Sequence, residues 1–151
     1  MEIKNKWTGE RLETFIYSYD TVDHLHRYAI ALEFVKNKTV VDIASGEGYG
    51  SSIVAEVANQ VIGIDIDESA VFFAKEKYKK ENLTFLVGRA DNIPIESKSV
   101  DVVISFETIE HHDKHDEMFS EIKRILKPEG ILIMSSPIAF NARKDLVNLL
   151  N

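Results

Sequence analysis

Cysteine is absent from the 151 residues of the chain. Its absence excludes disulfide bonds, thiolate catalysis and cysteine-ligated zinc, and it is compatible with a reducing compartment. No run approaches the roughly 20 apolar residues that a membrane-spanning helix needs. The first residues, MEIKNKWTGER, also lack the apolar centre of a signal peptide. We therefore expect a soluble, cytoplasmic protein without a membrane span.

Positive charge is also in short supply. The chain has 18 lysine and arginine residues against 25 aspartate and glutamate residues, a formal net charge of −7. This balance argues against a nucleic-acid partner, because phosphate binding requires clustered basic side chains, and it favours a small-molecule substrate. There is no internal repeat and no linker rich in proline, glycine or serine. We expect one folded core at 23–151, preceded by a polar N-terminal arm at 1–22.

The hydrophobic pattern predicts short strands that alternate with amphipathic helices. Strands are expected at 39–44, 60–64, 83–87, 100–106 and 131–135, and helices at 23–35, 50–58, 68–80 and 115–126. A tight turn is expected at 127–130, KPEG, between the last helix and the last strand. Such alternation is typical of an α/β protein with a Rossmann-like, doubly wound and mostly parallel sheet, in which ligands bind beyond the carboxyl ends of the strands.

The first strand leads into a glycine-rich loop, VVDIASGEGYG, at 40–50. Small residues allow the backbone to approach a ligand closely, although the same pattern also occurs in a tight turn with no ligand. Asp65 follows the second strand, nineteen residues beyond Gly46, where a carboxylate can accept hydrogen bonds from ribose hydroxyls. Asp67 is expected to cap the helix that follows it. Together the loop and Asp65 indicate an adenosine-containing ligand, a feature that nicotinamide dehydrogenases and methyltransferases share.

From about 38 to 137 the sequence resembles the class I S-adenosylmethionine-dependent methyltransferases, in particular the type 11 group. The loop matches the first motif of that family, with Ala44 in place of a glycine, and we expect Ala44 to avoid positive φ. The segments GRADNIP at 88–94, DVVISFETIEH at 101–111 and LKPEGILIMSSP at 126–137 match further motifs in the correct order. Family members have a C-terminal strand hairpin, and we expect five strands without that hairpin in this sequence.

The resemblance implies S-adenosyl-L-methionine as cofactor and S-adenosyl-L-homocysteine as product. In the family the acid at Asp42 fixes the loop, the loop holds the methionine end, Ile66 covers the adenine ring and Asp91 accepts its amine. The cofactor-binding residues implied are Asp42, Ala44, Ser45, Gly46, Gly48, Asp65, Ile66, Ala90, Asp91, Asn92 and Phe106.

His111 is the candidate general base, since imidazole titrates near neutral pH; the alternative is a structural histidine that bonds the backbone. We predict no metal site from His111, His112, Asp113 and His115, because adjacent histidines point apart. The segment around Arg27 and Tyr28 resembles the N-terminal region of methyltransferases of surface-polysaccharide synthesis. The resemblance implies a lid over the cofactor, in which Arg27 meets a carboxylate and Tyr28 lines the acceptor pocket. Without that resemblance, Arg27 is a solvated residue and Tyr28 a core residue.

These observations predict a methyltransferase acting on a small molecule or a glycan-type acceptor. If the hairpin is missing, we expect either a shortened protein that forms a homodimer through the uncovered sheet edge or a fragment of a longer protein. A missing hairpin also leaves open a non-catalytic module that retains cofactor binding or serves in interactions. An oxidoreductase that binds NAD is the remaining alternative.

Overall fold

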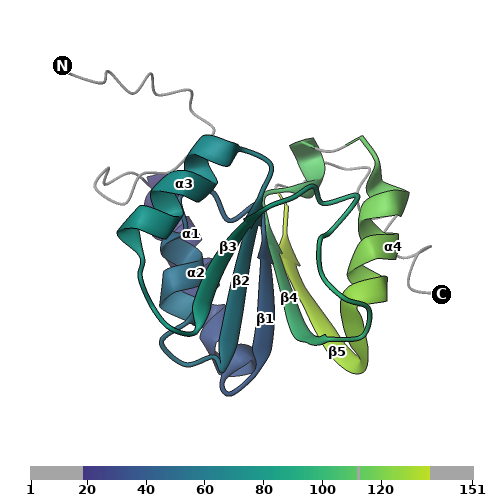
Figure 1. The fold of residues 1–151 in the computed structure, drawn as a ribbon, viewed down its shortest axis with the longest axis horizontal. Helices are drawn as coiled ribbons and strands as arrows, with labels where there is room; N and C mark the ends of the chain where they lie inside the picture. Colours follow the sequence, from purple (N-terminus) through teal and green to yellow (C-terminus); the bar gives the residue numbers. More distant parts are fainter. Residues whose placement is uncertain (1–18, 112, 137–151) are drawn as a thin grey trace.

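The structure is a computed structural model that describes residues 19–111 and 113–136. A single sheet carries helices on both faces (Figure 1). The helices are α1 (Tyr19–Val35), α2 (Tyr49–Val54), α3 (Glu68–Lys77) and α4 (His115–Ile125), with a short 3₁₀ helix, η1 (Ile109–His111). The strands are β1 (Thr39–Ile43), β2 (Gln60–Asp65), β3 (Leu83–Val87), β4 (Val100–Phe106) and β5 (Leu126–Ser135).

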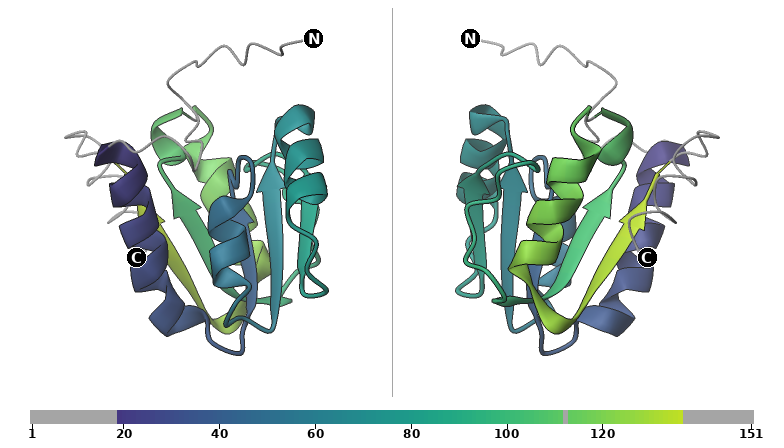
Figure 2. Two further views of the ribbon diagram at one scale, coloured as in Figure 1. Left: turned by 90° about the vertical axis from the view of Figure 1, so that its left-hand side faces the viewer. Right: turned by 90° about the vertical axis from the view of Figure 1, so that its right-hand side faces the viewer.

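The five strands are parallel and follow the order β3-β2-β1-β4-β5. Helices α1, α2 and α3 cover one face of the sheet and α4 covers the other (Figures 1 and 2). The strand order reverses direction beside β1, because the chain first moves outward to β3 and then crosses back to β4. The predicted Rossmann-like α/β fold is confirmed, with an entirely parallel sheet. In such a sheet, ligands bind where the strand order reverses.

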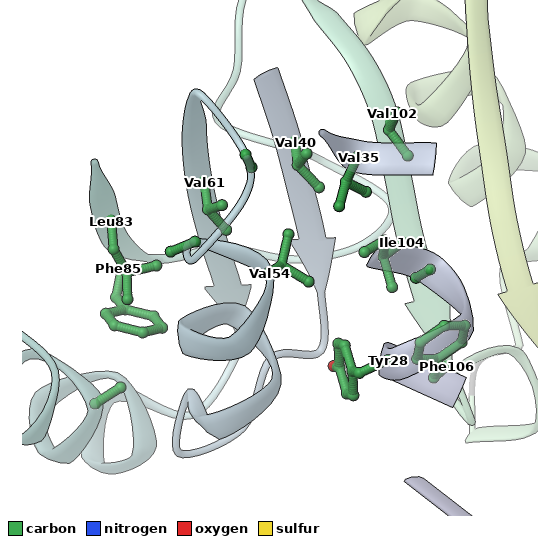
Figure 3. Packing of buried hydrophobic residues seen from close by; sticks show 14 of the residues in the cluster. Tyr28, Val35, Val40, Val54, Val61, Leu83, Phe85, Val102, Ile104 and Phe106 are labelled. Atoms are coloured by element: carbon green, nitrogen blue, oxygen red, sulfur yellow. The ribbon is translucent and has the colours of Figure 1, made fainter. Parts of the chain in front are cut away.

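Two hydrophobic clusters hold the layers together, one on each face of the sheet. Successive strand residues point to opposite faces, so that Val40 packs with α1, α2 and α3 whereas Val41 packs with α4. Figure 3 shows the first cluster, in which Tyr28 of α1 lies beside Phe106 at the end of β4. This packing fixes α1 against the strand ends that border the candidate site.

The connection from β3 to β4 contains no α-helix and is fixed to α4 by side chains. Glu121 accepts a hydrogen bond from the amide of Ile93 at 2.7 Å. Arg124 donates to the carbonyl oxygens of Ile93 and Ile95 at 2.9 and 2.7 Å. The two side chains also pair with each other, with Nε of Arg124 at 2.7 Å from Glu121. These bonds satisfy backbone groups that a helix would otherwise satisfy.

Several element boundaries differ from the sequence prediction. Helix α1 begins at Tyr19, four residues before the predicted start. Helices α2 and α3 end sooner than predicted, at Val54 and Lys77. The expected turn at 127–130 lies inside strand β5 as an irregularity, since Val100 pairs with Leu126 and Val102 with Ile131.

Within the described residues the sheet ends at β3 on one side and at β5 on the other, with no hairpin beyond β5. Residues 137–151 lie outside the described part of the chain, as does most of the predicted arm at 1–22. No helix of the described chain is long and apolar enough to cross a membrane.

Candidate active site

A cleft of about 950 Å³ opens at the carboxyl ends of the strands. Its walls come from the loop after β1, the ends of β2 and β3, the exit from β4 and the side of α1. This volume lies within the range of roughly 300–1,000 Å³ that is typical of small-molecule sites. The cleft therefore lies at the place where open parallel sheets bind ligands.

The glycine loop forms the base of the cleft. Gly46 and Gly48 have φ angles of 56° and 87°, a left-handed conformation that glycine adopts without strain. Gly46 has no heavy atom within 4 Å of the position that a Cβ would occupy, so the space above it is open to a ligand. Gly48 instead packs on the Phe85 ring, which is 2.5 Å from the position of a Cβ. The loop thus turns sharply while presenting bare backbone at Gly46.

Ala44 lies in the same loop with a φ angle of 58°. The expectation that it avoids positive φ is therefore wrong. The loop backbone is held on both sides, because the Ser45 amide donates to the Ile64 carbonyl and the Gly48 amide to the Ser45 carbonyl, each at 3.0 Å. These bonds impose the left-handed turn on whichever residue occupies position 44, and an alanine accepts the strain.

Asp42, at the end of β1, is fully buried beneath the loop. Its carboxylate accepts hydrogen bonds from the Ser51 hydroxyl at 2.7 Å and from the Tyr28 hydroxyl at 3.1 Å. Burial raises its pKa to about 7, although the bonds from Ser51 and Tyr28 act in the opposite direction. Asp42 thereby links α1, β1 and α2 around the loop, but it does not line the cleft.

Asp65, at the end of β2, lies beside the loop as predicted. One carboxylate oxygen accepts a hydrogen bond from the Gly46 amide at 2.8 Å, and the other accepts from the Asp67 amide at 2.9 Å. Two backbone amides thus orient the carboxylate at the cleft that Asp65 lines. Asp67 caps α3 by accepting from the amides of Ser69 and Ala70, which confirms its predicted capping role.

The loop after β3 brings only part of its predicted set to the cleft. Ala90 lines the cleft together with Ile66, whose side chain is 62% exposed and thus available to a flat ligand. Asp91 and Asn92 do not line it. The Asp91 carboxylate instead receives two bonds from Arg89, at 2.8 and 2.9 Å, and lies 3.3 Å from Lys114. The bonds from Arg89 hold the pKa of Asp91 below its usual range.

Helix α1 contributes an arginine and a tyrosine to the opposite wall. Arg27 forms an ion pair with Glu107 at 3.2 Å, across the space between α1 and the exit from β4. Tyr28 is 5% exposed, and its ring packs edge-on against Phe106 with centroids 5.0 Å apart. Tyr28 is therefore both a core residue and a border of the cleft, whereas Arg27 lines the cleft and is not simply solvated.

His111 lies in η1 at the rim of the cleft, and its side chain is 68% exposed. Its Nε2 lies 3.9 Å from Glu110. Among residues 19–111 and 113–136, no group of three histidine, aspartate or glutamate residues is placed to hold a metal ion. His112, which belongs to the cluster considered from the sequence, lies outside the described residues.

Among the residues that the structure describes, three buried hydroxyl groups have no hydrogen-bond partner, namely those of Ser45, Tyr49 and Ser105. A buried hydroxyl without a partner is energetically costly, and a bound ligand is one means of satisfying it. Ser45 and Tyr49 both line the cleft. These two groups are consistent with a site that is completed by a ligand.

The structure brings most of the predicted site residues together. Those that line the cleft are Arg27, Tyr28, Ala44, Ser45, Gly46, Asp65, Ile66, Ala90, Phe106 and His111. Asp42 and Gly48 support the loop from below, and Asp91 and Asn92 lie outside the lining. Sequence reasoning missed the roles of Tyr49, Glu107 and Glu110, which also line the cleft. Their position after β1 and β4 is the signal that could have identified them, because residues that follow strand ends face the ligand edge.

A glycine loop after the first strand and an acid after the second define the chain as an α/β protein of the nucleotide-binding type. The model of the type 11 methyltransferase-domain family matches residues 41–134, and the chain belongs to that family. A "Probable S-adenosylmethionine-dependent methyltransferase" of Mycolicibacterium smegmatis is 36% identical over 110 residues, covering 72% of this chain and 42% of that protein. A fatty-acid O-methyltransferase of the same organism is 27% identical over 120 residues, covering 74% and 44%.

Among solved structures, a chain from a complex with the Haloferax volcanii Trm112 methyltransferase activator superposes with a TM-score of 0.69 at 30% identity. The match covers 75% of the present chain and 52% of the other. The chain thus spans less than half the length of the two curated relatives that it matches. The chain matches only part of each relative, so the acceptor is inferred from the cleft itself.

Proposed function

We propose that the chain binds S-adenosyl-L-methionine in this cleft and transfers its methyl group to a small-molecule or glycan-type acceptor, releasing S-adenosyl-L-homocysteine. The observation that carries the proposal is the bond from the Gly46 amide to Asp65, in a chain of the methyltransferase-domain family. This hydrogen bond joins the glycine loop to Asp65, the acid proposed to bind the ribose, at one end of the cleft. Open backbone at Gly46, the exposed Ile66 and the partnerless Ser45 hydroxyl fit an adenosine-containing cofactor.

Each part of the cleft has a role in this proposal. Asp65 would accept two bonds from the ribose, and Ile66 and Ala90 would lie against the adenine. Ala44, Ser45 and Gly46 would hold the methionine end, with Phe106 nearby and Asp42 and Gly48 supporting the loop. Arg27 would meet the methionine carboxylate, because one guanidinium has five donors and can hold Glu107 and a ligand together. Asp91 would accept the adenine amine only after releasing part of its contact with Arg89, and Asn92 would lie at the ring edge.

S-adenosyl-L-methionine supplies, when bound, a methyl group activated by a sulfonium centre. The protein is then required mainly to align the acceptor with that methyl group and to exclude water. Helix α1 packs over the ends of β1 and β4 and would form a wall that keeps water out of this part of the cleft. His111 remains a proposed general base, with its exposed imidazole at the rim of the cleft.

Calorimetric titration with S-adenosyl-L-homocysteine tests the proposal. Wild-type protein should bind, and Asp65→Ala should weaken binding by about 100-fold, the equivalent of roughly 3 kcal/mol for two bonds to a charged acceptor. Asp67→Ser is the matched control, since serine keeps the helix cap and Asp67 does not line the cleft. Absence of binding to the wild type would refute the proposal, and binding of NADH in its place would favour an oxidoreductase.

A cofactor-binding module that acts with a partner is the second candidate. It is favoured by the structural neighbour that occurs in complex with a methyltransferase activator. The partner would be such an activator or a second copy paired through β5, which is an edge strand of the described sheet. This candidate would be supported if the protein binds S-adenosyl-L-homocysteine but does not methylate hydroxyl, amine or glycan acceptors, and if sedimentation analysis shows a dimer.

A further inference from the structure

Two glutamates, Glu107 and Glu110, follow strand β4 and line the cleft. Strand β4 lies between β1 and β5, whereas Asp65 follows β2 on the other side of the glycine loop. The two glutamates therefore lie away from the proposed ribose position, in the half of the cleft that remains for an acceptor. Glu107 has a φ angle of 52°, an uncommon conformation for a residue other than glycine and one that clusters at functional sites.

Glu107 is held firmly in place. Its carboxylate pairs with Arg27 at 3.2 Å and accepts a hydrogen bond from the Ser135 hydroxyl at 3.1 Å. Its backbone amide donates to the Ser135 carbonyl at 3.0 Å. Glu107 is accordingly the member of the pair that is fixed in place, through both its side chain and its backbone.

Glu110 has a different environment. Its carboxylate accepts a bond from the Ser136 hydroxyl at 3.3 Å and lies 3.9 Å from Nε2 of His111. Its side chain is 18% exposed. Burial, followed by the charge and hydrogen bond of Glu107, raises its pKa, while its own backbone amide and His111 lower it. Glu110 is therefore better suited than an ordinary surface glutamate to take up a proton at neutral pH.

The charge of the cleft favours one class of acceptor. Its acidic lining residues are Asp23, Glu47, Asp65, Glu107, Glu110 and Asp113. Of its two arginines, Arg89 pairs with Asp91, and Arg27 pairs with Glu107 and is assigned, under the proposed function, to the methionine carboxylate of the cofactor. An anionic nucleophile would thus face carboxylates without an uncommitted arginine or lysine in the described lining. A hydroxyl or an amine could instead donate its hydrogen to a carboxylate.

We propose that Glu107 and Glu110 are the acceptor-selecting residues of the proposed methyltransferase. They admit a nucleophile that can donate a hydrogen, which is a hydroxyl or an amine, and they reject a carboxylate. In the transfer, the O–H or N–H proton passes to a carboxylate oxygen of Glu110, which in this proposal acts as the general base in place of the His111 imidazole. The nucleophile's electron pair forms the bond to the methyl carbon as the carbon–sulfur bond breaks, and the electron pair of that bond stays on sulfur. This inference rests on the proposed function.

Three probes that differ only in their head group test the selection, namely octylamine, octan-1-ol and octanoate. Binding of each is measured by calorimetry on protein saturated with S-adenosyl-L-homocysteine. Octylamine and octan-1-ol should bind at least tenfold more tightly than octanoate, and Glu110→Gln should reduce this difference at least tenfold. Glu117→Gln, which removes the same charge from an exposed position in α4, is the control and should leave the difference unchanged.

The proposal is overturned if octanoate binds as tightly as the other probes, if Glu110→Gln leaves the difference unchanged, or if no probe binds to the saturated protein. A preference that appears only with added Mg²⁺ would also overturn it, because the glutamates would then act as metal ligands. If S-adenosyl-L-homocysteine itself fails to bind, the proposed function fails first, so the two failures are distinguishable.

A second measurement does not depend on any acceptor. In protein labelled with ¹³C at glutamate carboxyl groups, NMR titration should show Glu110 titrating above the ordinary glutamate range near 4.3. Glu107→Gln removes the neighbouring charge and should bring the Glu110 titration closer to that range. A Glu110 titration at the ordinary value in the wild type, or one unchanged by Glu107→Gln, would contradict the pairing.

Discussion

Replacing the buried Asp42 by asparagine should change how the stability of the protein depends on pH. Asp42 is fully buried, and burial raises its pKa to about 7. In the unfolded chain an aspartate titrates near 3.9. Between these two values the folded protein holds a proton that the unfolded chain has released. The contribution of Asp42 to stability is thus fully present below about pH 4 and is lost as pH rises through 7.

The magnitude follows from the difference between the two pKa values. A difference of roughly 3 units corresponds to about 4 kcal/mol over the whole range, with a slope of about 1.4 kcal/mol per pH unit. Asparagine does not titrate, and its carbonyl oxygen can still accept the bond from the Ser51 hydroxyl. The free energy of unfolding of Asp42→Asn, minus that of the wild type, should therefore rise by about 2 kcal/mol between pH 5 and pH 7.

Urea denaturation followed by circular dichroism at pH 5, 6 and 7 measures this difference. Asp101→Asn is the matched control, because the amide of Thr39 and the ammonium group of Lys127 lower the pKa of Asp101. The stability contributed by the Asp101 carboxylate is lost only as pH falls toward that lowered pKa. The free energy of unfolding of Asp101→Asn, minus that of the wild type, should therefore be constant from pH 5 to 7. A flat difference for Asp42→Asn over the same range would refute the reasoning.

Two further predictions concern backbone conformation and close packing. Ala44→Gly relieves a left-handed alanine and should stabilise the protein by about 0.5–1 kcal/mol, the strain of roughly 1–2 kcal/mol less the entropy that glycine adds to the unfolded chain. Ala29→Gly, at an exposed position inside α1, should instead cost about 1 kcal/mol. If thermal unfolding shows stability changes of the same sign for Ala44→Gly and Ala29→Gly, the left-handed conformation of Ala44 is contradicted. Gly50→Ala places a Cβ 2.0 Å from the Tyr28 ring and should cost about 3 kcal/mol. Gly46→Ala has open space and should cost only about 1 kcal/mol in the same assay, so a Gly50→Ala cost no larger than this would refute the packing.

Much of the fold can be read from the sequence, because its signals are local. The runs of valine and isoleucine predict the strands within a few residues, and the apolar spacing of 115–126 predicts α4 closely. The Asp67 cap was equally predictable, since it bonds amides only two and three residues away. Boundaries were less accurate where local pattern and packing disagree. The 127–130 segment carries turn residues, yet pairing of β5 with β4 includes it in the strand.

The candidate site divides in the same way. The loop at 40–50 and Asp65 were found from spacing alone, and their bond across nineteen residues supports that interpretation. The role expected of Asp91 was less secure, because the sequence does not show that Arg89 turns back onto it. The conformation of Ala44 was misjudged, since the bonds that impose it come from β2 and from the loop itself.

The sequence by itself determined the order of helices and strands, the glycine loop and the family, since each depends on residues close together in the chain. Only the tertiary structure decided which distant side chains share an environment. Arg27 and Glu107 lie 80 positions apart in the chain and meet because α1 packs against the end of β4. The unequal surroundings of Glu107 and Glu110 arise from that packing, because burial and charge depend on all neighbours in space and not on spacing in the sequence.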